Sequence, residues 1–241
     1  MASGITGGRE LRKAILGLLK TSDFDNGLAE LMRFPERKSV NALISLLYHT
    51  DEIIRWRAVS AIGVVVQRLA WKNREAARVI MRRLMWSLND ESGGIGWGAA
   101  EAMGEIMARD DVMASEYASI LISYLDEKGN FLEYEVLQRG ALWAIARLAR
   151  ERPGLLRNAA GHIPKYLDSR DPAVKGLAAL ASGLLGVEEA RSKLQRMLHD
   201  RSSVLVYQEG KVIDRSVGDL VREALDRLNA KIEDRRTSWR S

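Results

Sequence analysis

The feature that most constrains this chain is a segment that recurs about every 40 residues. Small residues mark the equivalent positions, which are 41, 42, 37 and 43 residues apart: Ala61, Ala102, Ala144, Ala181 and Ala224. A period of this length is typical of α-solenoids, in which each repeat is a pair of helices. Because one pair cannot bury its apolar face alone, the repeats are expected to stack on one another.

The spacing within a copy predicts one face of a helix. Positions 54, 58, 61, 62 and 65 of the first copy are apolar and lie four, three, one and three residues apart. A small residue recurs at the second of these positions and lets a neighbouring helix approach closely. Another amphipathic segment precedes each copy, and an additional pair is expected at the N-terminus. The sequence therefore predicts an all-α, right-handed α-solenoid of about six helix pairs.

One part of the last repeat has a β-type pattern. Residues 204–207 and 211–213 are rich in Val, Leu, Ile and Tyr, and Gln208, Glu209 and Gly210 separate them. This pattern predicts a short β-hairpin inserted between the two helices of the last repeat. Two interpretations stay open: a cap on the C-terminal end of the array, or an edge strand that a partner extends.

Composition limits the class of protein. The chain has 241 residues, four prolines and no cysteine, which favours helix and excludes disulfides and thiolate chemistry. No run of 18 apolar residues occurs, so we expect no membrane span, and the small polar N-terminus does not resemble a secretory signal. We expect a cytoplasmic protein with a flexible N-terminus (1–8), one solenoid domain (9–231) and a basic C-terminal tail (232–241).

The net charge of +5 arises from 37 basic and 32 acidic residues of interspersed sign. A nucleic-acid partner is therefore possible but not favoured over a protein partner.

Residues 51–63 and 171–183 resemble the HEAT repeat in its phycobilisome-lyase-like variant, whose second helix reads D-P-x-V-R-x-x-A-A-x-A-L-G. The resemblance covers residues 36–230, and the chain is also similar to uncharacterised bacterial HEAT-repeat proteins. It implies that the second helices line a concave surface that faces the ligand. It also implies that the basic residue after the valine stabilises the array. That residue is kept as Arg55 and Lys175, whereas Gly96 and Gln138 replace it in two repeats.

The sequence offers little for catalysis. The three histidines, His49, His162 and His199, fall in different repeats, and no H-E-x-x-H motif occurs. The glycine-rich run at residues 93–98 has neither a preceding strand nor a following Lys-Ser or Lys-Thr, so it is typical of a tight turn. We expect no enzyme, no metal site and no cofactor.

Tryptophans indicate a candidate surface. Trp56 and Trp97 occupy equivalent repeat positions, Trp143 lies one turn further along, and charged residues surround all three. Exposed aromatic residues within charges are typical of a binding hot spot, whereas inter-repeat packing is the alternative. The loops before the second and third copies are also longer and acidic, which suits a cationic ligand or a basic peptide. The candidate residues are Trp56, Arg57, Glu91, Trp97, Glu101, Glu105, Glu133, Arg139 and Trp143.

These observations favour a non-catalytic scaffold or adaptor that binds a protein or peptide on its concave face. One alternative is a nucleic-acid-binding protein like the HEAT-like alkylpurine DNA glycosylases. Another is a tetrapyrrole or cofactor lyase-chaperone like the phycobilisome lyases. The sequence leaves the partner's identity and the oligomeric state open.

Overall fold

The computed structural model describes residues 7–89 and 96–238 of the chain. It divides into two compact units, of which the first contains the residues up to Ala114 together with Tyr207–Val212. The second contains Ser115–Val206 and the residues from Ile213 onward. Residues 9–231, expected to form one domain, are thus divided between two units.

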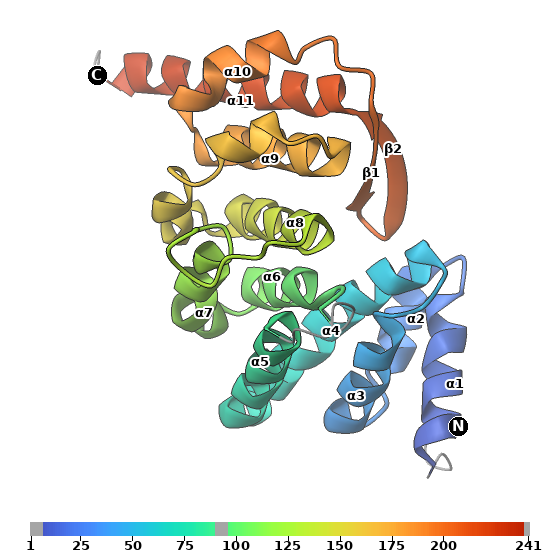
Figure 1. The fold of residues 1–241 in the computed structure, drawn as a ribbon. Coiled ribbons are helices and arrows are strands. Elements are labelled where there is room, and N and C mark those ends of the chain that lie inside the picture. Colours follow the sequence, from blue (N-terminus) through green and yellow to red (C-terminus); the bar gives the residue numbers. More distant parts are fainter. Residues whose placement is uncertain (1–6, 90–95, 239–241) are drawn as a thin grey trace. The chain divides into compact units, whose positions relative to one another are not determined.

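Helix pairs form the first unit. In each of its three pairs the two helices pack against each other: α1 with α2, α3 with α4, and α5 with α6. Between pairs, α1 packs against α3 and α4 packs against α6, so the pairs stack. The helices are α1 (Gly8–Leu19), α2 (Phe24–Leu31), α3 (Glu36–Leu46), α4 (Glu52–Lys72), α5 (Arg74–Leu88) and α6 (Ala99–Arg109) (Figure 1).

The second unit begins within α7 (Asp111–Ser123) and is centred on α8 (Glu135–Glu151), α9 (Pro172–Leu185) and α11 (Val217–Ser238). In this unit α9 packs against both α8 and α11. Shorter elements connect the long helices: the 3-10 helices η1 (Pro153–Ala159), η2 (Pro164–Asp168) and η3 (Glu188–Ala190), and α10 (Arg191–Arg196).

The second unit departs from regular pairing before α9. The apolar residues around Ile163 and Leu167 were expected to belong to the first helix of a pair, but the chain forms η1 and η2 there. Proline begins both turns and lacks the amide hydrogen that a continuous α-helix would need, which explains the break.

The repeat prediction is confirmed by burial. All five marker alanines have an exposed fraction of 0%, and each lies in a long helix that packs on a neighbour. Helices α9 and α11 approach each other closely. A Cβ added to Gly183 would lie 2.5 Å from the Ala224 Cα, so only glycine permits this approach. The fold class is an all-α solenoid with a small β-hairpin.

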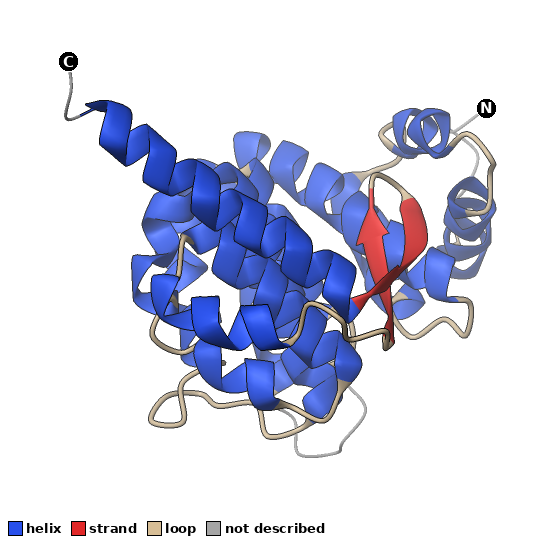
Figure 2. Cartoon of the chain, turned by 90° about the horizontal axis from the view of Figure 1, so that it is seen from above, coloured by secondary structure: helices blue, strands red, loops and turns tan. Residues whose placement is uncertain are grey.

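The hairpin is also confirmed, and it lies between α10 and α11. Strands β1 (Ser203–Gln208) and β2 (Lys211–Ser216) form the two-stranded sheet drawn in red in Figure 2. Glu209 and Gly210 have φ angles of 50° and 77°, as the two central residues of a type I′ turn require. The tip, Tyr207–Val212, belongs to the first unit.

At the chain ends, α1 begins at Gly8, while residues 1–6 of the expected flexible N-terminus lie outside the described residues. The predicted tail is helical over its described part, because α11 continues to Ser238. Among the described helices, none combines the length and the apolar character that crossing a membrane requires.

Candidate binding site

Trp56, in the first unit, is partly covered by the hairpin tip. The rings of Trp56 and Tyr207 stack nearly parallel, with centroids 5.1 Å apart and planes 5° apart. The Tyr207 hydroxyl forms a 2.9 Å hydrogen bond with the Ser60 hydroxyl, and both side chains are buried. Burial raises the pKa of Tyr207 to about 12, so the phenol stays protonated at neutral pH. This stretch of α4 is therefore occupied by the chain's own residues.

Arg57 holds the N-terminal helix pair in place. Its guanidinium donates to the backbone oxygens of Leu19 and Thr21, at 2.8 Å and 2.7 Å. The same group lies 4.9 Å from the centre of the Phe24 ring, within the range of a cation–π contact. Nε of Arg57 also donates to the Gly210 backbone oxygen at 3.4 Å. Four partners within the fold therefore hold the Arg57 side chain in place without any ligand.

A second group of candidate residues comes together between α4 and α6, and we name Arg55, Trp97 and Glu101 the α4–α6 cluster. Trp97 is 37% exposed, and the Arg55 guanidinium lies 5.9 Å from the centre of its ring. Nη2 of Arg55 is 3.8 Å from a carboxylate oxygen of Glu52. Nε of Arg55 is buried and has no hydrogen-bond partner among the described residues. The cluster thus offers an exposed aromatic ring beside a guanidinium that is itself partly exposed.

Glu101 gives the cluster an acidic group with an unusual pKa. It lies in the first turn of α6, and burial raises its pKa from 4.5 to about 7, although its own backbone amide and Arg55 act in the opposite direction. At neutral pH the carboxyl group is consequently poised between its neutral and charged forms. A cation placed beside it would favour the charged form.

The backbone before α6 explains why Trp97 stands at the surface. Gly98 has a φ of 74°, which L-residues other than glycine rarely adopt. A Cβ at Gly98 would also lie 3.0 Å from a methyl carbon of Leu47. The expected tight turn is therefore present at Gly98, while residues 90–95, including Glu91, lie outside the described residues.

Glu105 has a role in the fold. It is 3% exposed and forms an ion pair with Arg109 at 2.7 Å. A Cβ added to Gly63 would lie 2.5 Å from the Glu105 side chain, so α4 and α6 approach closely here. This packing places Glu105 between helices rather than on a ligand-facing surface.

The remaining candidates lie in the second unit. Trp143 is 6% exposed and packs in the interior, as its alternative interpretation described, so it forms no part of an exposed surface. Arg139 donates to a carboxylate oxygen of Asp171 at 2.8 Å. Burial favours the neutral form of Asp171, but this hydrogen bond and the amides of α9 outweigh it and lower the pKa. Glu133 is exposed in the loop before α8.

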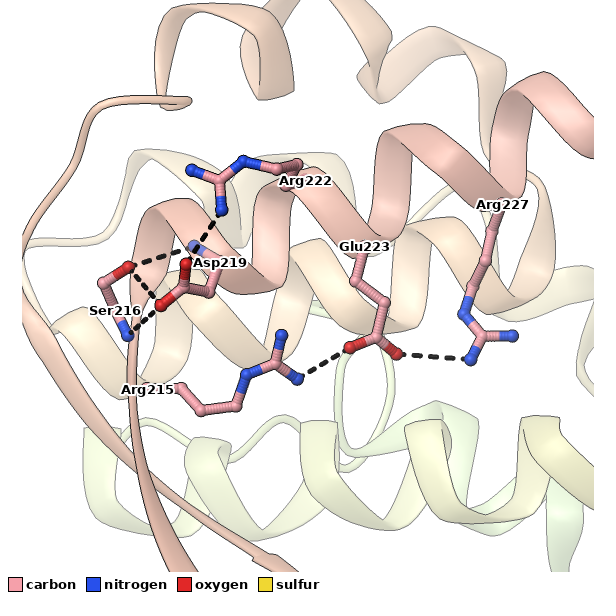
Figure 3. A network of polar contacts seen from close by, with 6 residues as sticks. All are labelled: Arg215, Ser216, Asp219, Arg222, Glu223 and Arg227. Atoms are coloured by element: carbon pink, nitrogen blue, oxygen red, sulfur yellow. Dashed lines mark hydrogen bonds and ion pairs between the residues drawn. The ribbon is translucent and has the colours of Figure 1, made fainter.

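Sequence reasoning missed a polar network on α11 (Figure 3). Ser216 and Asp219 cap the helix reciprocally: the Ser216 amide donates to the Asp219 carboxylate at 3.0 Å, and the Asp219 amide donates to the Ser216 hydroxyl at 3.1 Å. The spacing Ser-x-x-Asp is a capping-box signal that could have revealed it. Hydrogen bonds from Ser216 and from Arg222 lower the pKa of Asp219 to about 2.

The same network continues along α11 beside a surface depression of about 610 Å³. Glu223 accepts from Arg215 at 2.7 Å and from Arg227 at 3.2 Å. Each of these charges thus has an oppositely charged neighbour within the unit. The network stabilises the start of α11. Because its charges are already paired with one another, it is a weaker candidate for a ligand-binding site than the α4–α6 cluster.

Comparison with known proteins gives the fold a context. Neither a protein-family model nor a curated protein matches the sequence. Solved structures do match. A designed armadillo repeat protein in complex with the peptide (KR)4 aligns at 20% identity, covering 91% of this chain and 99% of its own, with a TM-score of 0.51. An engineered protein aligns at 19% identity, covering 92% and 99%, with a TM-score of 0.53.

The fold is a HEAT/armadillo-like helical repeat. An archaeal HEAT-like repeat protein from Thermococcus onnurineus NA1 also aligns, at 14% identity over 94% of this chain and 82% of its own, with a TM-score of 0.39. The conclusion on the fold depends on the matches above 0.5. No family match supports the finer phycobilisome-lyase-like assignment, which stays a prediction.

Proposed function

We propose that this HEAT/armadillo-like repeat protein is a non-catalytic scaffold that binds a peptide segment of a partner protein at the α4–α6 cluster. The observation that carries the proposal is the exposed Trp97 ring, which lies 5.9 Å from the Arg55 guanidinium, while that guanidinium also interacts electrostatically with the Glu101 carboxyl group. An aromatic anchor flanked by charges is typical of binding hot spots.

The chemistry of the cluster indicates what a ligand would bring. The Arg55 side chain is 32% exposed, and the accessible part of its guanidinium could donate to the backbone carbonyl oxygen of an extended peptide. Glu101 could accept a hydrogen bond from a Lys or Arg side chain, which would compensate for its desolvation. The designed armadillo protein that shares the fold holds a peptide of alternating Lys and Arg, which is consistent with a basic ligand.

Binding is favoured over catalysis by the surroundings of the histidines. Nδ1 of His49 accepts the backbone amide of Asp51 at 3.0 Å, and Nδ1 of His162 lies 3.9 Å from Asp126. In residues 7–89 and 96–238, no three His, Asp or Glu side chains are grouped so that they could hold a metal ion. We place the function in the cytoplasm, as composition suggests.

The proposal is tested with a fluorescent peptide of four Lys-Arg units, whose binding is followed by anisotropy. We expect Trp97→Ala to weaken binding by about 10-fold or more, as for a hot-spot residue. We expect the affinity of the native protein to rise between about pH 6 and pH 8, where Glu101 becomes charged, and we expect Glu101→Gln to remove that rise.

The matched control is Trp71→Ala, because Trp71 is 73% exposed at the far end of α4. It should bind the peptide as the native protein does. Equal binding by the Trp97→Ala and native proteins would overturn the site, and no binding of this peptide by the native protein would overturn the basic-ligand class.

A further inference from the structure

Charge is distributed unevenly along the chain, which the net charge of +5 does not reveal. Residues 7–89, which include α1 to α5, contain 15 Lys and Arg side chains but only eight Asp and Glu. Residues 96–238 contain 21 Lys and Arg side chains and 22 Asp and Glu side chains. The excess positive charge therefore belongs to the helices of the first unit.

The acidic residues of that stretch are largely committed to structural contacts. Glu36 lies 2.8 Å from Arg68 and 2.5 Å from Lys72, and Glu75 forms ion pairs with Arg78 and Arg82. Asp23 and Asp51 cap α2 and α4. Within their bounds α1 and α3 contain five Lys and Arg side chains against two acidic ones, Glu10 and Glu36, and Glu36 is already paired with Arg68 and Lys72.

Three helices bring basic side chains to one continuous surface. Nε of Arg12 on α1 donates to the Ser45 hydroxyl on α3 at 2.9 Å. Nη1 of Arg83 on α5 donates to the Asn41 side-chain oxygen, also on α3, at 2.6 Å. These bonds place α1, α3 and α5 side by side in the first unit, as Figure 1 shows. Each guanidinium has further donors with which it can bind an anion.

A groove of about 340 Å³ follows the junction of α1 and α3. Its lining includes Arg12 and Lys38, whose side chains are exposed, and it contains no carboxylate. The groove also reaches the N-terminus of α1, where the positive end of the helix dipole is opposed by Glu10 of the first turn, so Arg12 and Lys38 supply the positive charge of the groove. The groove is thus suited to a phosphate or another anion.

The same surface carries an exposed aromatic ring. Trp86 is 78% exposed and lies one turn beyond Arg82 and Arg83 on α5. A large apolar ring left in water beside arginines provides a stacking platform for an unpaired base, and base–aromatic stacking tolerates any sequence. Bases within a duplex are already stacked, so this ring favours a single strand.

We propose that α1, α3 and α5 form a binding surface for single-stranded nucleic acid. Arg12, Lys38 and Arg83 contact the phosphates, and Trp86 stacks on a base. Adjacent packed helices lie about 10 Å apart, so the surface spans roughly 20 Å, which is enough for several nucleotides. This surface is separate from the α4–α6 cluster and does not depend on the peptide proposal.

The test uses the full-length protein and a fluorescent oligothymidylate of about 16 nucleotides, within the range of known single-strand sites. Anisotropy is measured from about 50 to 200 mM salt. The triple variant Arg12→Gln, Lys38→Gln and Arg83→Gln retains hydrogen-bonding side chains but loses three charges. We expect the slope of log K against log salt to become shallower by about 2, since each single-strand contact contributes about 0.7.

Trp86→Ala tests the stacking step separately. It should weaken binding by about 5- to 100-fold and leave the salt slope unchanged, because stacking releases no counterion. Trp71→Ala is the control for removal of an exposed Trp. The control for charge is a triple variant of exposed arginines in the second unit, Arg157→Gln, Arg196→Gln and Arg201→Gln.

Each outcome of these measurements either supports or overturns the proposed nucleic-acid surface. Weaker binding by both test variants, with both controls near the native affinity, supports the proposal. The proposal is overturned if the native protein does not bind the oligonucleotide, or if the test and control triple variants lose the same affinity. It is also overturned if a duplex binds as tightly as the single strand and its affinity is unchanged by Trp86→Ala. Binding only to vesicles that contain about one-third phosphatidylserine would also overturn it, in favour of a membrane surface.

Discussion

Glu101 shows how one side chain can make folding depend on pH. Its pKa is 4.5 in an ordinary setting and about 7 in the fold, where burial disfavours the charged form. Between these values the folded state binds more protons than the unfolded state. The free energy of unfolding therefore decreases as pH rises from about 4.5 to 7, and it stays lower above that range.

Glu101→Gln should remove this penalty, because glutamine remains neutral. We expect the variant to exceed the native protein in unfolding free energy by up to about 3 kcal/mol at pH 8 and to match it near pH 4. Urea unfolding at both pH values measures the difference. The exposed Glu133→Gln serves as the control, and a constant difference at both pH values would contradict the expected origin of the effect.

Tyr207 illustrates a different contribution, because its ring and its hydroxyl act separately. Tyr207→Phe should cost about 1 kcal/mol, since it leaves the buried Ser60 hydroxyl without its bond. Tyr207→Ala should cost about 3 to 5 kcal/mol, because the stack on Trp56 is also lost and a cavity remains. Urea unfolding followed by Trp fluorescence measures both, and equal costs would show that the ring contributes little.

At the scale of elements, helix pairing in the second unit depends on small residues. Gly183→Ala on α9 would place a Cβ 2.9 Å from the Ala224 Cβ on α11, so the helices must separate. We expect a loss of about 1 to 3 kcal/mol in the free energy of unfolding. Gly17→Ala on α1 is the control, because nothing lies within 4 Å and helix propensity predicts a gain of about 0.5 to 1 kcal/mol. Calorimetric melting would reveal opposite shifts.

The sequence predicted well those helices and strands whose formation depends on the local pattern of residue types. Apolar spacing within each copy identified the buried helix faces, and β-type residues around Gly210 identified the hairpin. The break before α9 was missed, although the prolines at 153 and 164 could have indicated it.

The candidate site was less predictable, because its residues find partners far away in the sequence. Arg57 binds carbonyl oxygens 36 and 38 residues away, and Trp56 stacks on a ring contributed by the hairpin. No helical period contains that information. By contrast, the uneven charge of residues 7–89 is visible in the sequence, and only counting over the whole chain obscured it.

For the whole molecule, the discontinuous composition of the first unit is the main feature. The unit is incomplete without Tyr207–Val212, which comes from the other end of the chain. A fragment that ends at Ala114 would therefore lack the ring that covers Trp56 and the partner of Ser60.

We expect the fragment 1–114 to be less stable than the same helices in the full chain and to bind the dye ANS, which reports exposed apolar surface. The comparison is made by circular dichroism and dye fluorescence at equal concentration. A fragment as stable as the intact protein, with no dye binding, would show that the tip is dispensable.

The Trp56–Tyr207 stack also provides an intrinsic spectroscopic signal. Two aromatic rings fixed 5.1 Å apart contribute to the near-ultraviolet circular dichroism, a signal that vanishes when side-chain packing is lost. Displacement of the hairpin tip by a binding partner would thus alter the spectrum without any attached label, whereas a ligand that leaves the tip seated would not.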